Sequence, residues 1–305
     1  MERRLPRVIA VLLLVVAVAT AGSLTWWRTL SAPPSDGPDV DGAADRGSDR
    51  GLDDTADGVA DGPGGETGPT RLTGRWTAVA TARHPHDPEA FTQGLEVIDD
   101  GRMLESTGLL GASTVRIVDI ETGEVERLRP IGADRFGEGV TVVGDRILQL
   151  TWTNGELVVS DLATLAEVNV VAYDGEGWGL CHDGDRLVMS DGSATLTFRH
   201  PETFEATGSV EVTIDGRPLE RLNELECIGD QVWANVLMTD DIAVIDPATG
   251  SVEATVDASA LAAEMDDPAD VLNGIAYDDR HDILYLTGKR WDVLYEVRLV
   301  PADDP

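Results

Sequence analysis

The residues from Trp76 to Val300 contain five diverged copies of one short pattern, and this repetition limits the folds that the chain can adopt. Each copy has a five-residue opening segment, a short apolar run, a turn rich in glycine and aspartate, and a second apolar run. The five opening segments are Phe91–Leu95, Phe136–Val140, Glu176–Leu180, Arg221–Leu225 and Val271–Ile275. Turns of this composition join antiparallel strands, so each copy is expected to form a β-rich unit.

The spacing of the copies indicates how many strands each one holds. The central residues of the opening segments are separated by 45, 40, 45 and 50 positions, and they are Gln93, Glu138, Trp178, Asn223 and Asn273. Four short strands in a unit of this length are typical of propeller blades. The fifth copy lacks a fourth strand, which residues 76–83 could supply by pairing the two ends of the domain. We therefore predict an all-β fold, a five-bladed β-propeller over residues 71–305, with an open β-sandwich as the competing fold.

Residues 1–30 have the pattern of a targeting segment. Basic residues at positions 3, 4 and 7 precede an apolar run over 8–21, which ends in a possible cleavage site of small residues. Trp26 and Trp27 would instead suit the membrane interface of a retained anchor. The segment is therefore predicted to be a signal peptide or a membrane anchor. Both alternatives export the domain, which is expected to be extracytoplasmic and either secreted or anchored.

Residues 31–70 are predicted to form a disordered acidic linker. They are rich in glycine, proline, aspartate and serine and hold almost no large apolar residues, so they cannot bury enough surface to offset their chain entropy.

The whole chain has a net charge of −33. This balance argues against a nucleic-acid partner and against broad binding to anionic lipid. Contact with a membrane is therefore expected only through the N-terminal segment.

Propeller geometry predicts where the functional site lies. The first strand of each blade lines the central channel, so the central residues of the five opening segments should form a ring at one mouth. The ends of the second strands lie near the same mouth and add Thr107, Trp152, Asp191, Asn235 and Lys289. A concave mouth lined by converging polar and aromatic groups is the default hypothesis for a binding site.

Motifs along the whole domain resemble, in order, those of the plant and bacterial glutaminyl-peptide cyclotransferases. The matching stretches include His86–Leu95, Phe136–Gly139, Gln149–Trp152, Glu176–Leu180, Leu222–Glu226, Leu272–Ala276 and Thr287–Lys289. The family fold is a five-bladed propeller, which agrees with the repeat count. The resemblance implies an acyltransferase that acts on peptide or protein N-termini bearing glutamine. The glutaminyl residue would cyclise to pyroglutamate and release ammonia.

The resemblance also implies roles for individual residues. Glu138 matches the catalytic glutamate of the family, and the other matching positions are expected to bind substrate. These positions are Phe91, Gln93, Phe136, Trp152, Trp178, Asn223 and Lys289. The chemistry of the family needs no metal or other cofactor, although a structural calcium has been associated with the fold. We expect a monomer and no catalytic metal.

One departure from the family pattern concerns the wall of the pocket. Where the family commonly has tryptophan after an Ala-Asn-Val sequence, this chain has Leu237. A smaller aliphatic side chain there puts substrate affinity, specificity and activity in question, but it does not touch Glu138.

The residues also suit the chemistry on physical grounds. Ring closure is intramolecular, so the enzyme mainly fixes one rotamer of the substrate. The α-amino group, whose pKa is about 7.7–8.0, must lose a proton, and the leaving nitrogen must gain one. Glu138 could carry that proton, because Gly137 and Gly139 allow close backbone approach and neighbouring aromatic rings would raise its pKa. Polar side chains of the ring could bind the oxygen that becomes negative in the tetrahedral intermediate.

Two other functions remained open. One is a non-catalytic propeller that binds a peptide or protein at the same mouth. The other is a propeller hydrolase or lactonase, which would need a metal-binding cluster of carboxylates in the channel. Glu224 and Glu226 are candidates for a structural or calcium role, whereas His84 and His86 lack a third zinc ligand at a useful spacing.

The two cysteines, Cys181 and Cys227, occupy nearly equivalent places in neighbouring repeats. An exported chain could join them in one disulfide, or they could remain as two buried thiols.

Overall fold

The computed structural model describes residues 71–267 and 270–302, and nearly all of its regular structure is β. The predicted targeting segment and linker lie outside the described residues. Within the described part of the chain, no helix has the length and apolar character needed to cross a membrane. The prediction of an all-β domain is confirmed.

The first three repeats form three separate antiparallel sheets of four strands each. The first sheet holds β2 (Thr92–Asp99), β3 (Arg102–Thr107), β4 (Thr114–Asp119) and β5 (Val125–Pro130). The second holds β6 (Gly137–Val143), β7 (Arg146–Thr151), β8 (Glu156–Asp161) and β9 (Glu167–Ala172). The third holds β10 (Leu180–His182), β11 (Leu187–Met189), β12 (Thr195–Arg199) and β13 (Ala206–Glu211). In each sheet the strands pair in the order in which they occur along the chain.

The last two repeats share one sheet of eight strands, in the order β16-β17-β18-β19-β1-β22-β21-β20. One half holds β16 (Leu222–Ile228), β17 (Gln231–Val236), β18 (Asp241–Ile245) and β19 (Val252–Asp257). The other half holds β20 (Leu272–Asp278), β21 (Ile283–Gly288), β22 (Val293–Pro301) and β1 (Gly74–Pro85). The remaining elements are a short ribbon and one turn of helix, namely β14 (Thr213–Ile214), β15 (Arg217–Pro218) and α2 (Ser259–Ala262).

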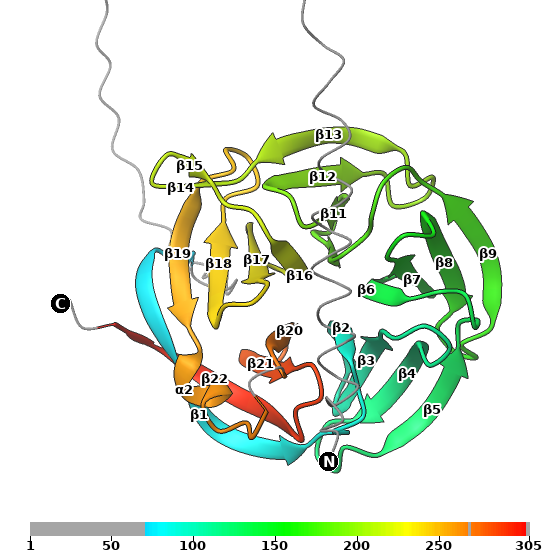
Figure 1. Ribbon diagram of the computed structural model, residues 1–305, viewed down its shortest axis with the longest axis horizontal. Coiled ribbons are helices and arrows are strands. Elements are labelled where there is room, and N and C mark those ends of the chain that lie inside the picture. The colour runs from blue at the N-terminus through cyan, green and yellow to red at the C-terminus, as the bar shows by residue number, and fades with distance from the viewer. Residues whose placement is uncertain (1–70, 268–269, 303–305) are drawn as a thin grey trace, which may run out of the picture. The chain divides into compact units, whose positions relative to one another are not determined.

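Strand β1, from the beginning of the domain, completes the last repeat. It pairs antiparallel with β22 from Trp76 opposite Pro301 to Pro85 opposite Val293. The predicted pairing of the two ends of the domain is therefore confirmed. At its beginning, over Gly74 to Thr77, the other edge of the same strand also pairs in parallel with β19, which joins the last two repeats into one sheet. The sheets follow one another around a common centre, with β2, β6, β16 and β20 innermost (Figure 1).

The hydrophobic core lies between neighbouring sheets. One cluster joins Leu104 and Ile117 of the first sheet to Val140 and Ile147 of the second. Other clusters join the remaining pairs of neighbours in the same way. Each sheet therefore buries its faces against the next one, which fixes the inner strands beside one another. A disulfide between Cys181 and Cys227, with Cα atoms 5.5 Å apart, also links β10 to β16.

Candidate functional site

The opening segments meet because glycine lets their backbones approach closely. A Cβ atom on Gly139 would lie 2.5 Å from the backbone nitrogen of Leu180, and one on Gly137 would lie 2.7 Å from the carbonyl oxygen of Thr107. Neither space can accept a side chain. The prediction that these glycines permit close approach is confirmed, and they place Glu138 between the first and third sheets.

Four polar side chains of the predicted ring and its surroundings form one hydrogen-bonded chain. The Asn223 side-chain nitrogen donates to Asn273 Oδ1 at 2.7 Å. Asn273 Nδ2 in turn donates to Gln93 Oε1 at 3.4 Å, and Lys289 Nζ donates to the same oxygen. All four residues are buried. The repeats far apart in sequence therefore meet as the spacing predicts, and Asn273 links two predicted substrate-binding residues.

Glu138 is the ring residue whose carboxylate is left without a hydrogen-bond partner among the described residues. Its side chain is only 5% exposed, and its backbone oxygen accepts a hydrogen bond from Ser106. Burial raises the pKa of Glu138 well above its usual range, and the nearby charge of Glu176 raises it further, whereas Lys289 opposes the shift. Burial lowers the pKa of Lys289 to about 8, although Glu138 acts in the opposite direction. Burial thus shifts the pKa values of the two groups toward each other, while their mutual attraction opposes both shifts.

Three aromatic rings pack together next to Lys289. Phe91 and Phe136 meet edge to face at 6.1 Å between centroids, and Phe136 meets Trp152 in the same manner at 5.7 Å. Lys289 Nζ lies 4.9 Å from the centroid of the Phe91 ring. Three of the predicted aromatic residues therefore pack against one another next to Lys289, and Phe136 lies two residues before Glu138 in the chain.

Trp178 forms a further part of the enclosure. Its ring packs on Gly192, where a Cβ atom would lie 2.6 Å from the ring. Its backbone oxygen accepts a hydrogen bond from Gly139 at 2.6 Å, so it is adjacent to the Glu138 segment. The indole nitrogens of Trp152 and Trp178 both donate to Glu176 Oε2, at 2.8 and 3.1 Å.

Three residues expected near the mouth have other partners. Asp191 is exposed and accepts hydrogen bonds from Ser193 in its own loop. Asn235 Oδ1 accepts from the backbone nitrogen of Gly274, and the Thr107 hydroxyl pairs with Thr114. In the structure Asp191 therefore orders its own loop, Asn235 joins β17 to β20, and Thr107 joins β3 to β4.

Two residues were missed or left without a role. Asn273 was identified as a ring position, but its link to Gln93 depends on side-chain direction. Glu176 begins the motif Glu176–Leu180, and its position two residues before Trp178 was the sequence feature that could have identified it.

Leu237, the predicted departure in the pocket wall, is partly buried, and its backbone nitrogen donates to the Arg221 oxygen at 2.9 Å.

Possible metal ligands do not converge. No group of three or more histidine, cysteine, aspartate or glutamate side chains in the described residues is arranged to hold a metal ion. His84 Nε2 pairs with Glu296 at 2.8 Å, whereas His86 Nδ1 meets the Trp291 oxygen at 2.7 Å and its Nε2 meets Glu105. The two histidines therefore serve separate contacts. A structural calcium therefore stays a prediction, without a cluster of ligands for it among the described residues.

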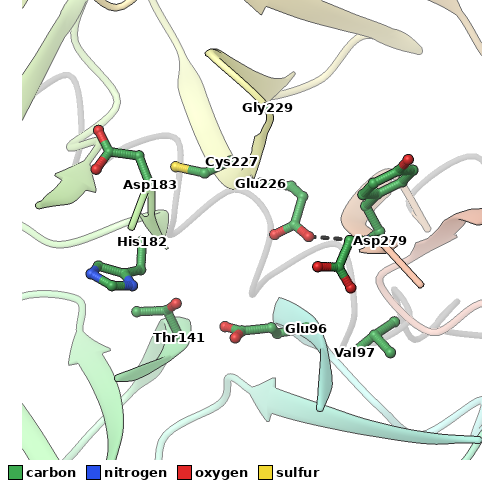
Figure 2. A pocket seen from close by; sticks show the side chains of 10 residues that line it. Glu96, Val97, Thr141, His182, Asp183, Glu226, Cys227, Gly229 and Asp279 are labelled. Carbon is green, nitrogen blue, oxygen red and sulfur yellow. Dashed lines mark hydrogen bonds between the residues drawn. The ribbon is translucent and has the colours of Figure 1, made fainter. Parts of the chain in front are cut away.

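A cavity of about 390 Å³ lies at the opposite ends of the inner strands from the ring. Figure 2 shows Glu96 and Glu226 projecting into it from β2 and β16. The backbone nitrogen of Tyr277 donates to Glu226 at 3.0 Å. Nearby Glu224 accepts from the backbone nitrogens of Leu95 and Ile275, so these carboxylates hold neighbouring strands together.

The sequence matches the family model for glutamine cyclotransferase over residues 60–299. It is 42% identical over 226 residues to the glutaminyl-peptide cyclotransferase of Arabidopsis thaliana, with 72% of this chain and 71% of the relative covered. The structure resembles the crystal structure of Myxococcus xanthus glutaminyl cyclase with a TM-score of 0.71 and 39% identity, covering 76% of this chain and 100% of that one. The chain therefore belongs to the glutamine cyclotransferase family.

Proposed function

We propose that this protein is a glutaminyl-peptide cyclotransferase, an acyltransferase that converts N-terminal glutaminyl residues of peptides and proteins to pyroglutamate and ammonia. The observation that carries the proposal is the buried carboxyl of Glu138, which has no hydrogen-bond partner among the described residues and interacts electrostatically with Lys289. A group held in this way keeps its lone pairs available to a substrate proton. Family membership supports the same reaction.

The reaction needs one proton to move between two nitrogen atoms of the same substrate residue. The α-amino nitrogen attacks the side-chain amide carbon, and Glu138 accepts the proton that this nitrogen loses. The carboxyl then gives the proton to the amide nitrogen, the carbon–nitrogen bond breaks, and ammonia leaves. Burial raises the pKa of the Glu138 carboxyl toward the pKa of the α-amino group, which is about 7.7–8.0. The proton therefore passes between the two groups in either direction at a small cost in free energy.

The chain of polar side chains supports the negative oxygen of the tetrahedral intermediate. Lys289 is a cation in a buried site, where a charge–charge interaction is stronger than in water. Gln93 accepts the hydrogen bond of Lys289, and Asn273 holds Gln93 in turn. These contacts keep the donors in place before substrate arrives, which is the condition for electrostatic stabilisation.

The aromatic residues restrict the substrate and exclude water. The glutaminyl side chain has several rotatable bonds, and the attacking nitrogen must reach the amide carbon. Walls formed by Phe136, Trp152 and Trp178 would favour the folded rotamer, which removes much of the entropic barrier. Exclusion of water also maintains the raised pKa of Glu138.

We further propose that the five units of four strands act as the blades of a five-bladed propeller. The order of the sheets and the pairing of β1 with β22 support this arrangement. The apolar and basic pattern of residues 1–30 supports an extracytoplasmic location, secreted or membrane-anchored, with residues 31–70 as an acidic linker. The protein is proposed to act as a monomer on peptide or protein N-termini.

Ammonia release from a glutamine-initiated dipeptide tests the proposal. Wild-type domain should release ammonia well above background, and Glu138→Gln should lower kcat by about 10²–10⁴-fold, the usual contribution of general acid–base catalysis. Binding of the dipeptide should persist in this variant. If wild type releases no ammonia and both proteins bind the dipeptide equally, the protein is a peptide-binding propeller. The smaller side chain of Leu237 is the observation that favours that second function.

A further inference from the structure

Glu176 joins two walls of the site that come from different sheets. It lies between β9 and β10 and is partly buried. One of its oxygens, Oε2, accepts the indole hydrogen bonds of Trp152, which follows β7, and of Trp178, which precedes β10. A single carboxylate therefore fixes the relative orientation of both rings.

The two indole nitrogens have no other hydrogen-bond partner within the described residues. The backbone nitrogen of Trp152 donates to the Phe136 oxygen at 3.0 Å, and the Trp152 ring packs edge to face against Phe136 with 5.7 Å between centroids. The Trp178 ring packs closely on Gly192. Each ring is thus placed by its own neighbours, and Glu176 supplies the hydrogen bonds that join the two rings.

Glu176 is also a charge that acts on Glu138. Its negative charge raises the pKa of Glu138, after the larger effects of burial and of Lys289. The other ionisable group next to Glu138 is Tyr173, whose hydroxyl donates to the Thr151 oxygen at 2.6 Å. The charge of Glu224 in turn raises the pKa of Lys289, against the larger effect of burial. Removing the charge of Glu176 would therefore favour the ionised form of Glu138.

We propose that Glu176 is a positioning residue that holds Trp152 and Trp178 as the paired walls of the substrate slot. The proposal rests on the proposed cyclisation at this site. The hydrogen-bonding role and the charge are different properties of one carboxylate. A glutamine keeps an acceptor oxygen for the indoles and loses the charge, whereas an alanine loses both.

The test compares Glu176→Gln and Glu176→Ala with the control Glu121→Gln, which alters an exposed turn residue. The glutamine variant should keep KM within about twofold of wild type, and the acidic limb of its pH profile for kcat/KM should move to lower pH by about half a unit, the size expected for one nearby charge. The alanine variant should raise KM by about tenfold, as loss of one ordered wall predicts. Tryptophan emission should shift to longer wavelength in the alanine variant alone.

Each outcome decides one part of the proposal. If the alanine variant matches the control in KM and emission, the positioning role is wrong. If the glutamine variant raises KM as much as alanine does, the acceptor oxygen is not what holds the walls. An unmoved acidic limb would remove the effect of the charge on Glu138. Tryptophan emission can be measured without turnover, so it tests how Glu176 holds the two indole rings even if wild type releases no ammonia. Absence of ammonia release would instead refute the proposed function.

Discussion

Replacing Asn273 with alanine should damage the site without touching the reacting groups. Asn273 is 0% exposed, and its side chain makes three hydrogen bonds. It accepts from Asn223 Nδ2 at 2.7 Å and donates to the Thr92 oxygen at 2.9 Å and to Gln93 Oε1 at 3.4 Å. Alanine removes all three and leaves a small space between β2, β16 and β20.

The cost follows from the groups that lose their partners. The Asn223 amide nitrogen and the Thr92 carbonyl oxygen are buried, and leaving such a group unsatisfied costs about 1–3 kcal/mol. Two orphaned groups predict a loss of about 2–6 kcal/mol in the free energy of unfolding. Gln93 keeps its contact with Lys289 but loses the one that orients it. We expect kcat/KM to fall by about 10–100-fold, which corresponds to about 1.4–2.7 kcal/mol.

Urea denaturation followed by circular dichroism would measure the stability, and ammonia release would measure kcat/KM. Asn169→Ala is a matched control, because Asn169 is an exposed asparagine on the outer strand β9. The control should change the free energy of unfolding by less than about 0.5 kcal/mol. If Asn273→Ala and Asn169→Ala have the same stability and the same kcat/KM, the hydrogen-bonded chain has no role in the site.

Three further changes have expected outcomes. Replacing both Cys181 and Cys227 with serine should lower the free energy of unfolding by up to about 4 kcal/mol, as closure of a 46-residue loop predicts, and an unchanged urea midpoint would contradict this. Burial raises the pKa of Glu96 to about 7 and of Glu224 to about 8, so their stabilising effect is complete below about pH 4.5 and is lost as the pH rises toward 8. The thermal midpoint should therefore fall between pH 5 and pH 8.5, and Glu96→Gln should flatten that fall; a midpoint that rises instead would refute the assignment. Leu237→Trp should lower KM by restoring an aromatic wall, whereas an unchanged KM would place residue 237 outside the slot.

Much of the fold is determined by short-range patterns that a sequence displays directly. Turns rich in glycine and aspartate mark the hairpins, and their regular spacing counts the units. Pairing of β1 with β22 follows from one missing strand at the end of the chain. The parallel pairing of β1 with β19 could not be predicted, because it depends on how the outer edges of two units meet in space.

The convergence of the repeat positions was predictable, and the contacts between their side chains were not. Equivalent residues of successive units converge, and the structure joins Gln93, Asn223 and Asn273 in this way. The order of hydrogen bonds from Asn223 to Lys289 depends on rotamers, which no spacing records. The hydrogen bonds from Trp152 and Trp178 to Glu176 could not be predicted for the same reason, since Trp152 belongs to another unit.

Burial alone does not identify the reacting carboxyl in this domain. Burial raises the pKa of Glu224 to about 8 and that of Glu226 and Glu138 well above the usual range. The first two accept hydrogen bonds from backbone nitrogens, so their lone pairs are occupied in holding strands together. Glu138 has no such donor among the described residues, and its charge interacts with that of Lys289. A carboxyl that strands do not use is free to take a proton from a substrate, and this difference, more than the size of any pKa shift, is the reason that we propose Glu138 as the proton carrier.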